Sequence, residues 1–122
     1  MATSRVDEQL REPAVSGVEN RDGAVLVHLA GELDLHNAPE VRQALDKVLA
    51  RKPEQLIVDL AEVVFVDSAA VGVLIDARRR LQKRDGFLVA APGVEIRRAL
   101  EVSGLDRQFA VVDSVDAAFA AR

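Results

Sequence analysis

The residues best suited to chemistry lie in the segment FVDSAAVG, residues 65–72. An apolar run typical of a buried strand ends there in Asp67 and Ser68, and the small apolar residues that follow favour a helix. Ser68 would then present its hydroxyl at a helix N-terminus, beside backbone N–H groups that have no partner within the helix. Because serine is a preferred N-cap residue, these residues alone favour a cap over an anion-binding site.

A second candidate consists of Glu32, Asp34 and His36, because alternate residues of an extended segment point to one face. Such a row of carboxylates and an imidazole could ligate a divalent metal. The segment 31–37 also fits a strand-to-helix loop whose polar residues meet water, and no second histidine lies near enough to complete a site. We therefore expect no metal site. We expect His28, within an apolar strand, to be a hydrogen-bonded structural residue.

A third candidate is the run of arginines at 78–80. Consecutive helical residues point about 100° apart, so the run indicates a solvated helix end, where the dipole favours cations. With 16 Lys and Arg against 20 Asp and Glu, a net charge of -4 and 3% aromatic residues, the chain lacks the surface typical of nucleic-acid binding. We expect no direct contact with nucleic acid or with a membrane.

The 122 residues contain no cysteine, which excludes disulfides, thiolate metal sites and cysteine nucleophiles. The sequence also lacks the glycine-rich phosphate loop, the dinucleotide fingerprint and the serine elbow of hydrolases. We therefore expect a protein that is not an enzyme and that uses no cofactor. No signal peptide is visible, and no apolar run approaches the roughly 20 residues of a membrane span, so we expect a cytoplasmic protein.

The candidate residues must be positioned by one domain, given the chain's length and its 49% hydrophobic share. Apolar spacing predicts strands at 15–19, 24–30, 55–66 (one interrupted strand or two), 87–91 and 109–112, and helices at 38–49, 69–83, 94–102 and 115–119. Asn37 is the expected N-cap of the first helix, and Asp113 or Ser114 that of the last. An opening hairpin followed by alternating helices and strands predicts an α/β domain with a mainly parallel, mixed sheet. Residues 1–13 are expected to form a flexible tail, and the domain to span 14–122.

Two stretches of this pattern resemble the STAS family, the domain of sulfate transporters and bacterial anti-sigma factor antagonists. The first is LAGELD at 29–34, and the second is LIVDL at 56–60, which runs into the FVDS of the segment above. The resemblance covers residues 14–121. It implies a single STAS domain, with a mixed sheet and about four helices.

The resemblance also implies the function of an anti-sigma factor antagonist. Family antagonists are phosphorylated on the serine of the D-S pair by a partner kinase that is itself the anti-sigma factor, which marks Ser68 as the phosphorylation site. The unphosphorylated protein would bind the anti-sigma factor kinase and free a sigma factor, phosphorylation would end the binding, and a serine phosphatase would reset the system. The implied partner-binding residues are Asp34, Asp67, Ser68, Ala69, Ala70 and Val71.

The chain departs from the family pattern D-S-[ST]-G-[LV]-G at two positions. Ala69 and Ala70 replace the hydroxyl residue and the first glycine, while Gly72 is retained. An alanine in place of glycine favours the helix by about 1 kcal/mol. Two other functions stay open: a STAS interaction subunit that is not phosphorylated and that docks a lipid-transport ATPase or a signalling particle, and a sensor of a small ligand or nucleotide at the helix N-terminus. We expect a monomer or a weak dimer.

Overall fold

The computed structural model describes residues 13–81, 86–104, 107 and 110–120. In this part of the chain strands and helices follow the predicted order. The elements are β1 (Val15–Arg21), β2 (Ala24–Leu33), α2 (Ala38–Leu49), β3 (Gln55–Val66), α3 (Ser68–Arg80), β4 (Phe87–Ala90), α4 (Val94–Val102), β5 (Ala110–Val112) and α5 (Val115–Ala120). The predicted tail up to residue 12, the predicted last turn of the second helix at 82–83 and the predicted strand residue 109 lie outside the described residues.

The strands form one sheet in the order β1-β2-β3-β4-β5. β1 is antiparallel to β2, and every later neighbour is parallel, which confirms the predicted mixed sheet with its opening hairpin. The hairpin turns at Asp22 and Gly23, whose φ angles of 50° and 86° suit the twist of a two-residue turn. Because β2 to β5 follow one another in chain order, right-handed crossovers place their connecting helices on the same face of the sheet.

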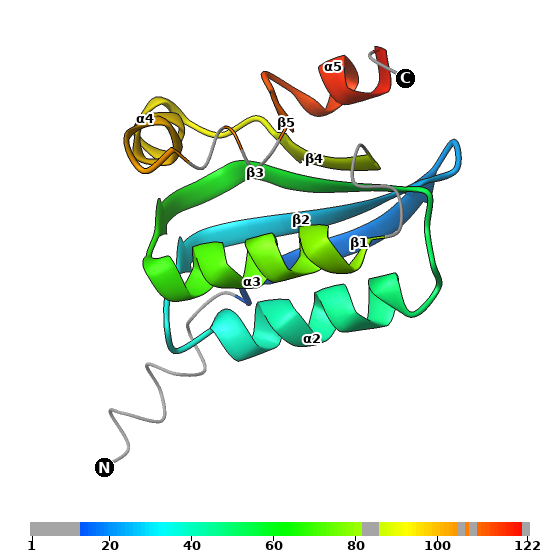
Figure 1. Ribbon diagram of the computed structural model, residues 1–122, viewed down its shortest axis with the longest axis horizontal. Helices are drawn as coiled ribbons and strands as arrows, with labels where there is room; N and C mark the ends of the chain where they lie inside the picture. Colours follow the sequence, from blue (N-terminus) through cyan, green and yellow to red (C-terminus); the bar gives the residue numbers. More distant parts are fainter. Residues whose placement is uncertain (1–12, 82–85, 105–106, 108–109, 121–122) are drawn as a thin grey trace.

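Helices cover both faces of the sheet. Figure 1 shows α2 and α3 side by side along one face and α5 on the opposite face. Residues of β2 alternate between the faces: Val25 and Val27 join the core cluster that contains the inward residues of α2 and α3, whereas Leu26 joins Ala118 of α5 in a second cluster. The continuous apolar character of residues 24–30 correctly predicts a strand buried on both faces.

β2 departs most from its predicted bounds, whereas β1 runs two residues further, to Arg21, β4 ends one residue earlier, at Ala90, and β3 keeps the predicted bounds. β2 extends to Leu33 instead of ending at Ala30, because Gly31 adopts a φ of 78° and the pairing with β3 continues. Glu32 therefore lies in a strand rather than in the predicted loop. β3 is one strand of 12 residues, and its register against β2 shifts twice, each time by one extra residue in β3. Such bulges explain why the apolar pattern of β3 looks interrupted.

The helix caps are partly as predicted. Ser114 caps α5, since its Oγ accepts a hydrogen bond from the N–H of Ala117 at 2.9 Å. The cations expected at the end of the second helix, Arg78 to Arg80, form the last turn of α3. None of the helices within the described residues has both the length and the apolar character that a membrane crossing needs.

Candidate functional site

The N-cap of α3 is Asp67. Its backbone is extended (φ -107°, ψ -179°), and its Oδ1 accepts a hydrogen bond from the backbone N–H of Ala70 at 3.0 Å. This is N-cap geometry, because the side chain satisfies an N–H of the first turn that the helix leaves without a partner. The simple expectation that Ser68 is the cap is therefore wrong by one residue, and Ser68 is the first residue of the helix.

Asp67 also joins α3 to the turn between β2 and α2. Its Oδ2 accepts a hydrogen bond from the N–H of Leu35 at 3.0 Å, and its own N–H donates to the carbonyl of Leu33 at 3.0 Å. These bonds bring together the two sequence stretches that were singled out, LAGELD and FVDS. The turn and the helix start therefore form one structural unit.

The turn is closed by its own side chains. Asp34 Oδ1 accepts hydrogen bonds from the N–H groups of His36 and Asn37, at 2.9 and 3.2 Å. Asn37 Oδ1 accepts from the N–H of Asp34 at 2.8 Å, and its Nδ2 donates to the carbonyl of Glu32 at 2.6 Å. Asn37 stands at the N-cap position of α2, as predicted, but its side chain holds the turn and makes no cap bond. In the described part of the chain, no group of three acidic or histidine residues could hold a metal ion.

Ser68 is exposed, and its hydroxyl makes no hydrogen bond to any described residue. As the first residue of α3, it lies at the positive end of the helix dipole, where an added anion is stabilised. The hydroxyl is therefore open to solvent. Its position is set by the backbone that Asp67 holds.

An apolar groove of about 440 Å³ opens beside Ser68, between α3 and α4. The lining residues are Val66, Asp67, Ser68, Val71, Gly72, Ile75, Ala99, Leu100 and Ser103. They include one carboxylate and no cation. The Ser103 hydroxyl donates to the carbonyls of Ala99 and Leu100, at 2.7 and 3.2 Å, so it is already used within α4. The groove suits an apolar side chain better than an anionic one.

Gly72 is exposed in this groove, and a Cβ at its position would meet no atom within 4 Å. Packing within the chain therefore does not require glycine here. Glycine in a helix interior costs about 0.5 to 1 kcal/mol relative to alanine. The missing side chain leaves space for a group from outside the chain.

The predicted surface residues after Ser68 do not all face outward. Ala69 and Val71 are half-buried, with Ala69 packed against the main core cluster and Val71 lining the groove. Ala70 is only 2% exposed and lies in that cluster. Helical periodicity turns this position inward, so the prediction of Ala70 as a contact residue is corrected: it supports the surface from beneath.

The sequence profile of the STAS domain matches residues 17–118. The chain belongs to the STAS domain family. It is 30% identical over 92 residues to the anti-sigma-F factor antagonist RsfB of Mycobacterium tuberculosis, with 75% of each chain covered. It is 36% identical over 81 residues to the anti-sigma-B factor antagonist of Listeria monocytogenes, with 65% of this chain and 70% of that protein covered.

Solved structures confirm the STAS fold. A crystal structure of an anti-sigma factor antagonist from Mycobacterium paratuberculosis matches with a TM-score of 0.81 at 36% identity, and the match covers 86% of this chain and 90% of that one. The unphosphorylated form of the anti-sigma factor antagonist SpoIIAA matches with a TM-score of 0.70 at 23% identity, covering 84% and 91% of the two chains. At that identity the second match supports the fold alone.

In this STAS domain, the structure brings the turn of Asp34 next to Asp67 and Ser68. Sequence reasoning missed Leu35, which is 71% exposed and bonded through its N–H to Asp67. It also missed the contribution of α4 to the groove. The apolar pattern marks Leu100 as a core residue, but it carries no signal for which helix α4 lies beside.

Proposed function

We propose that this STAS domain is an anti-sigma factor antagonist that binds an anti-sigma factor kinase, and that phosphorylation of Ser68 ends the binding. The observation that carries the proposal is the exposed hydroxyl of Ser68 at the start of α3, which lies beside an apolar groove and bonds to none of the described residues. The class of partner comes from relatives that are named anti-sigma factor antagonists.

The unphosphorylated surface offers apolar contacts around one hydroxyl. Leu35 is exposed and lies near the start of α3, because its backbone N–H is bonded to the Asp67 carboxylate. The groove with Val71 and Gly72 lies on α3 itself. A partner that fills the groove with an apolar side chain buries this surface together with Ser68. The contact surface we propose thus comprises Asp34, Asp67, Ser68, Ala69 and Val71, extended by Leu35 and Gly72 and supported by Ala70.

A phosphate on Ser68 would act in opposite directions in the free protein and in the complex. It adds about 1.5 to 2 negative charges, which the dipole of α3 stabilises by roughly 0.3 to 1 kcal/mol. In the complex it would lie over a groove that contains the Asp67 carboxylate and no cation. Burying such a charge without a partner costs several kcal/mol, and each 1.4 kcal/mol weakens binding tenfold. Phosphorylation therefore releases the partner without unfolding the domain.

The test uses candidate anti-sigma factor kinases from the same organism. Wild type, Ser68→Ala and Ser68→Asp are titrated with each kinase by calorimetry, and Ser103→Ala serves as a control that removes another hydroxyl of the groove. Wild type, Ser68→Ala and Ser103→Ala should bind alike, and Ser68→Asp should bind at least about tenfold more weakly. After incubation with kinase and ATP, mass spectrometry should find phosphate on Ser68 and none in Ser68→Ala. Equal binding by Ser68→Asp, or phosphate on another residue, would refute the switch.

The same Ser68 variants also test the two other functions that the sequence leaves open. A STAS interaction subunit that is not phosphorylated would bind its partner equally in all Ser68 variants. A sensor at the helix N-terminus would be stabilised against thermal unfolding by a nucleotide or small anion, and Ser68→Asp would lose that effect. For the proposed switch, a serine phosphatase should restore kinase binding to the phosphorylated protein.

A further inference from the structure

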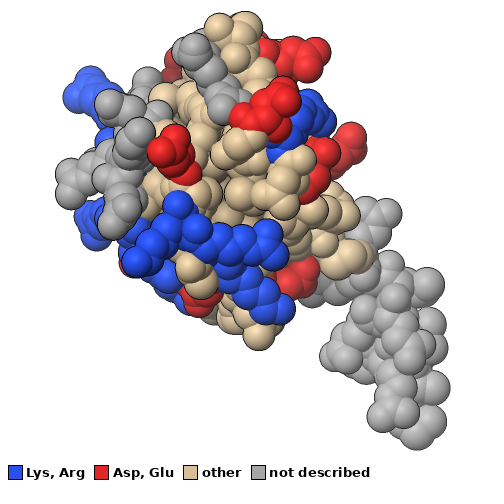
Figure 2. Space-filling view, turned by 90° about the vertical axis from the view of Figure 1, so that its right-hand side faces the viewer, with Lys and Arg blue, Asp and Glu red and all other residues tan. Residues whose placement is uncertain are grey.

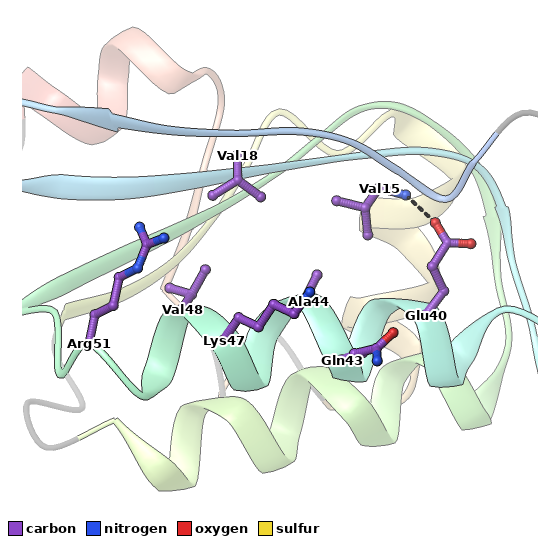
Figure 3. Close-up of a pocket in the computed structure, with 8 residues that line it drawn as sticks. All are labelled: Val15, Val18, Glu40, Gln43, Ala44, Lys47, Val48 and Arg51. Carbon is purple, nitrogen blue, oxygen red and sulfur yellow. Dashed lines mark hydrogen bonds between the residues drawn. The ribbon is translucent and has the colours of Figure 1, made fainter.

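A second groove lies between β1 and α2. Its volume is about 360 Å³, and Figure 3 shows the eight residues that line it: Val15, Val18, Glu40, Gln43, Ala44, Lys47, Val48 and Arg51. Among the described residues β1 pairs with β2 alone, so it is an edge strand of the sheet. The groove therefore lies beside a strand edge, and such an edge is a template for an added strand.

The floor of this groove is apolar. Val18 is 45% exposed although it pairs with Val27, which is fully buried in the main core. Figure 3 shows Val15 and Val18 pointing toward α2, opposite Ala44 and Val48. The inward face of the sheet thus extends past the helix that covers it, and leaves aliphatic surface open to solvent.

The rim of the groove is cationic. Lys47 and Arg51 form no ion pair with any residue in the described part of the chain. The nearby arginines differ, since Arg42 pairs with Asp76 and Arg80 with both Asp46 and Asp76. The groove also contains one carboxylate, Glu40, at the end away from Arg51. This carboxylate accepts a hydrogen bond from the N–H of Val15 at 3.0 Å.

The cationic rim belongs to a larger basic surface. The C-terminal turns of α2 and α3 lie side by side, because Arg80 of α3 contacts Asp46 of α2. Lys52, Arg78 and Arg79 therefore add charge at the same end of the domain, and Figure 2 shows a band of Lys and Arg side chains across this side. In a protein of net charge -4, such a local excess indicates a surface for an anionic partner.

We propose that the β1–α2 groove binds an extended, acidic segment of a partner protein that adds as a strand to β1. On the face of the added strand that points toward α2, an aliphatic side chain fills the floor at Val18 and Val48, and carboxylates two residues before and after it meet Lys47 and Arg51. Backbone hydrogen bonds to a strand edge and pockets for alternate side chains are the usual elements of such recognition. A second copy of this chain fits less well, because the same cations would face each other across the contact.

The cationic rim of this surface, Lys47 and Arg51, is remote from the proposed phosphorylation site. Ser68 begins α3 and the basic band includes its last turn, and a helix of 13 residues is about 20 Å long. A segment bound at β1 would therefore leave Ser68 accessible. The proposal does not depend on the Ser68 switch, and either can fail alone.

The probe is an acetylated, amidated peptide of sequence ETLTE, whose leucine and two glutamates share one face of an extended strand. It is added to ¹⁵N-labelled protein at millimolar concentration, and binding is followed by NMR. Chemical-shift changes should be confined to β1 and to residues 43–51, and they should weaken as salt is added. The variant Lys47→Glu/Arg51→Glu should bind about tenfold more weakly. Arg98→Glu/Arg107→Glu makes the same charge change at two exposed residues outside the groove and should bind like wild type.

Three results would overturn the proposal. One is the absence of shifts in β1 and α2 with ETLTE, and another is an equal loss of binding in both charge-reversal variants. The third is a preference for the peptide KTLTK or for vesicles of phosphatidylglycerol over ETLTE, which would mean a different partner. Ser68→Asp should bind ETLTE like wild type, which separates this result from any failure of the proposed switch.

Discussion

Asp67 determines the geometry around Ser68, although Ser68 is the residue that carries the hydroxyl. One carboxylate oxygen of Asp67 caps α3 through Ala70, and the other holds the turn through Leu35, 32 residues earlier in the chain. Because Ser68 makes no side-chain hydrogen bond to the described residues, its position is set by this neighbour. The aspartate of the D-S pair is thus a structural requirement for presenting the serine.

Replacing Asp67 by alanine should lower the free energy of unfolding by about 2 kcal/mol. Loss of an N-cap costs about 1 kcal/mol, and loss of the hydrogen bond to Leu35 about another. Urea denaturation followed by circular dichroism measures the change. The control Glu62→Ala removes an exposed carboxylate of β3, the strand that ends just before Asp67. It should change the free energy of unfolding by less than about 0.5 kcal/mol. Equal stability of the two variants would contradict this role of Asp67.

His28 links three strands through two carboxylates. Its Nδ1 lies 2.7 Å from Asp59 Oδ2 on β3, and its Nε2 lies 2.8 Å from Glu19 Oε1 on β1. This confirms the prediction of a hydrogen-bonded structural histidine. Partial burial lowers the pKa of His28, but the hydrogen bonds to Glu19 and Asp59 together raise this pKa above its ordinary value of 6.5. The hydrogen bond with His28 in turn lowers the pKa of Glu19.

The His28 cluster should make stability depend on pH near neutrality. Because the folded pKa of His28 is raised, its stabilising effect is complete below pH 6.5 and is lost as the pH rises through the folded value. The lowered pKa of Glu19 affects stability at acidic pH. Its stabilising contribution is present above pH 4.5 and is lost as the pH falls through the folded pKa of Glu19. Arg21 also pairs with Glu19, at 3.1 Å.

The measurement compares wild type with His28→Gln by urea denaturation at several pH values. The stability advantage of wild type should be largest between pH 4.5 and 6.5 and should shrink at higher pH. His36→Gln, which removes an imidazole from the exposed turn, is the matched control. An advantage of wild type that stays constant from about pH 5 to pH 9 would show that His28 acts by packing alone.

At the scale of elements, periodicity predicts what each segment is, and tertiary contacts decide where it ends. The apolar runs at 24–30 and 87–91 correctly predict buried strands, because a strand buried on both faces needs continuous apolar character. The extension of β2 to Leu33 depends on pairing with β3 and on the left-handed backbone of Gly31, which local sequence does not determine. The cap of α3 depends on the extended backbone of Asp67, which local sequence does not determine, so the sequence alone predicts Ser68 as the cap.

The groove between α3 and α4 also arises at the scale of elements. Each helix shows its own apolar face in the sequence, but their separation depends on how the sheet spaces β3, β4 and β5. Sequence reasoning therefore found Ser68 and Asp67, which lie on one short segment, and missed Ala99 and Leu100 of α4. A site built from one segment can be predicted from its motif, whereas a site shared by two elements needs their packing.

Gly72→Ala should stabilise the protein and weaken partner binding. An added Cβ meets no atom within 4 Å, so the free energy of unfolding should rise by about 0.5 to 1 kcal/mol. The same methyl group enters the groove that the anti-sigma factor is proposed to fill, so its affinity should fall. Calorimetric titration with the kinase and urea denaturation measure the two effects. Gly93→Ala adds a methyl group with equal space outside the groove and should leave affinity unchanged. Unchanged affinity of Gly72→Ala would remove this groove from the proposed interface.

At the scale of the whole molecule, the domain presents different surfaces at the two ends of α3. Its N-terminal end carries the Ser68 hydroxyl beside an apolar groove, and its C-terminal end carries three arginines beside the basic end of α2. The main core cluster includes Ala70 near one end of the helix and Ala77 near the other. A charge added at Ser68 can therefore affect the opposite end only by moving α3, which is packed into the core along its length.

The last prediction is that phosphorylation of Ser68 leaves the fold and the opposite end unchanged. The phosphate lies at the positive end of the α3 dipole, so the free energy of unfolding should rise by about 0.3 to 1 kcal/mol or stay the same. Changes in backbone NMR shifts should be confined to the start of α3, the turn at 34–37 and α4, with none in β1 or the end of α2. The Ser68→Ala protein after the same kinase treatment is the control. Loss of stability on phosphorylation, or shifts at Val18 and Arg51, would instead mean that the phosphate acts by remodelling the domain. The partner would then be released because the domain changes its fold. If the shift changes are local, the partner is released by the phosphate's charge at the interface.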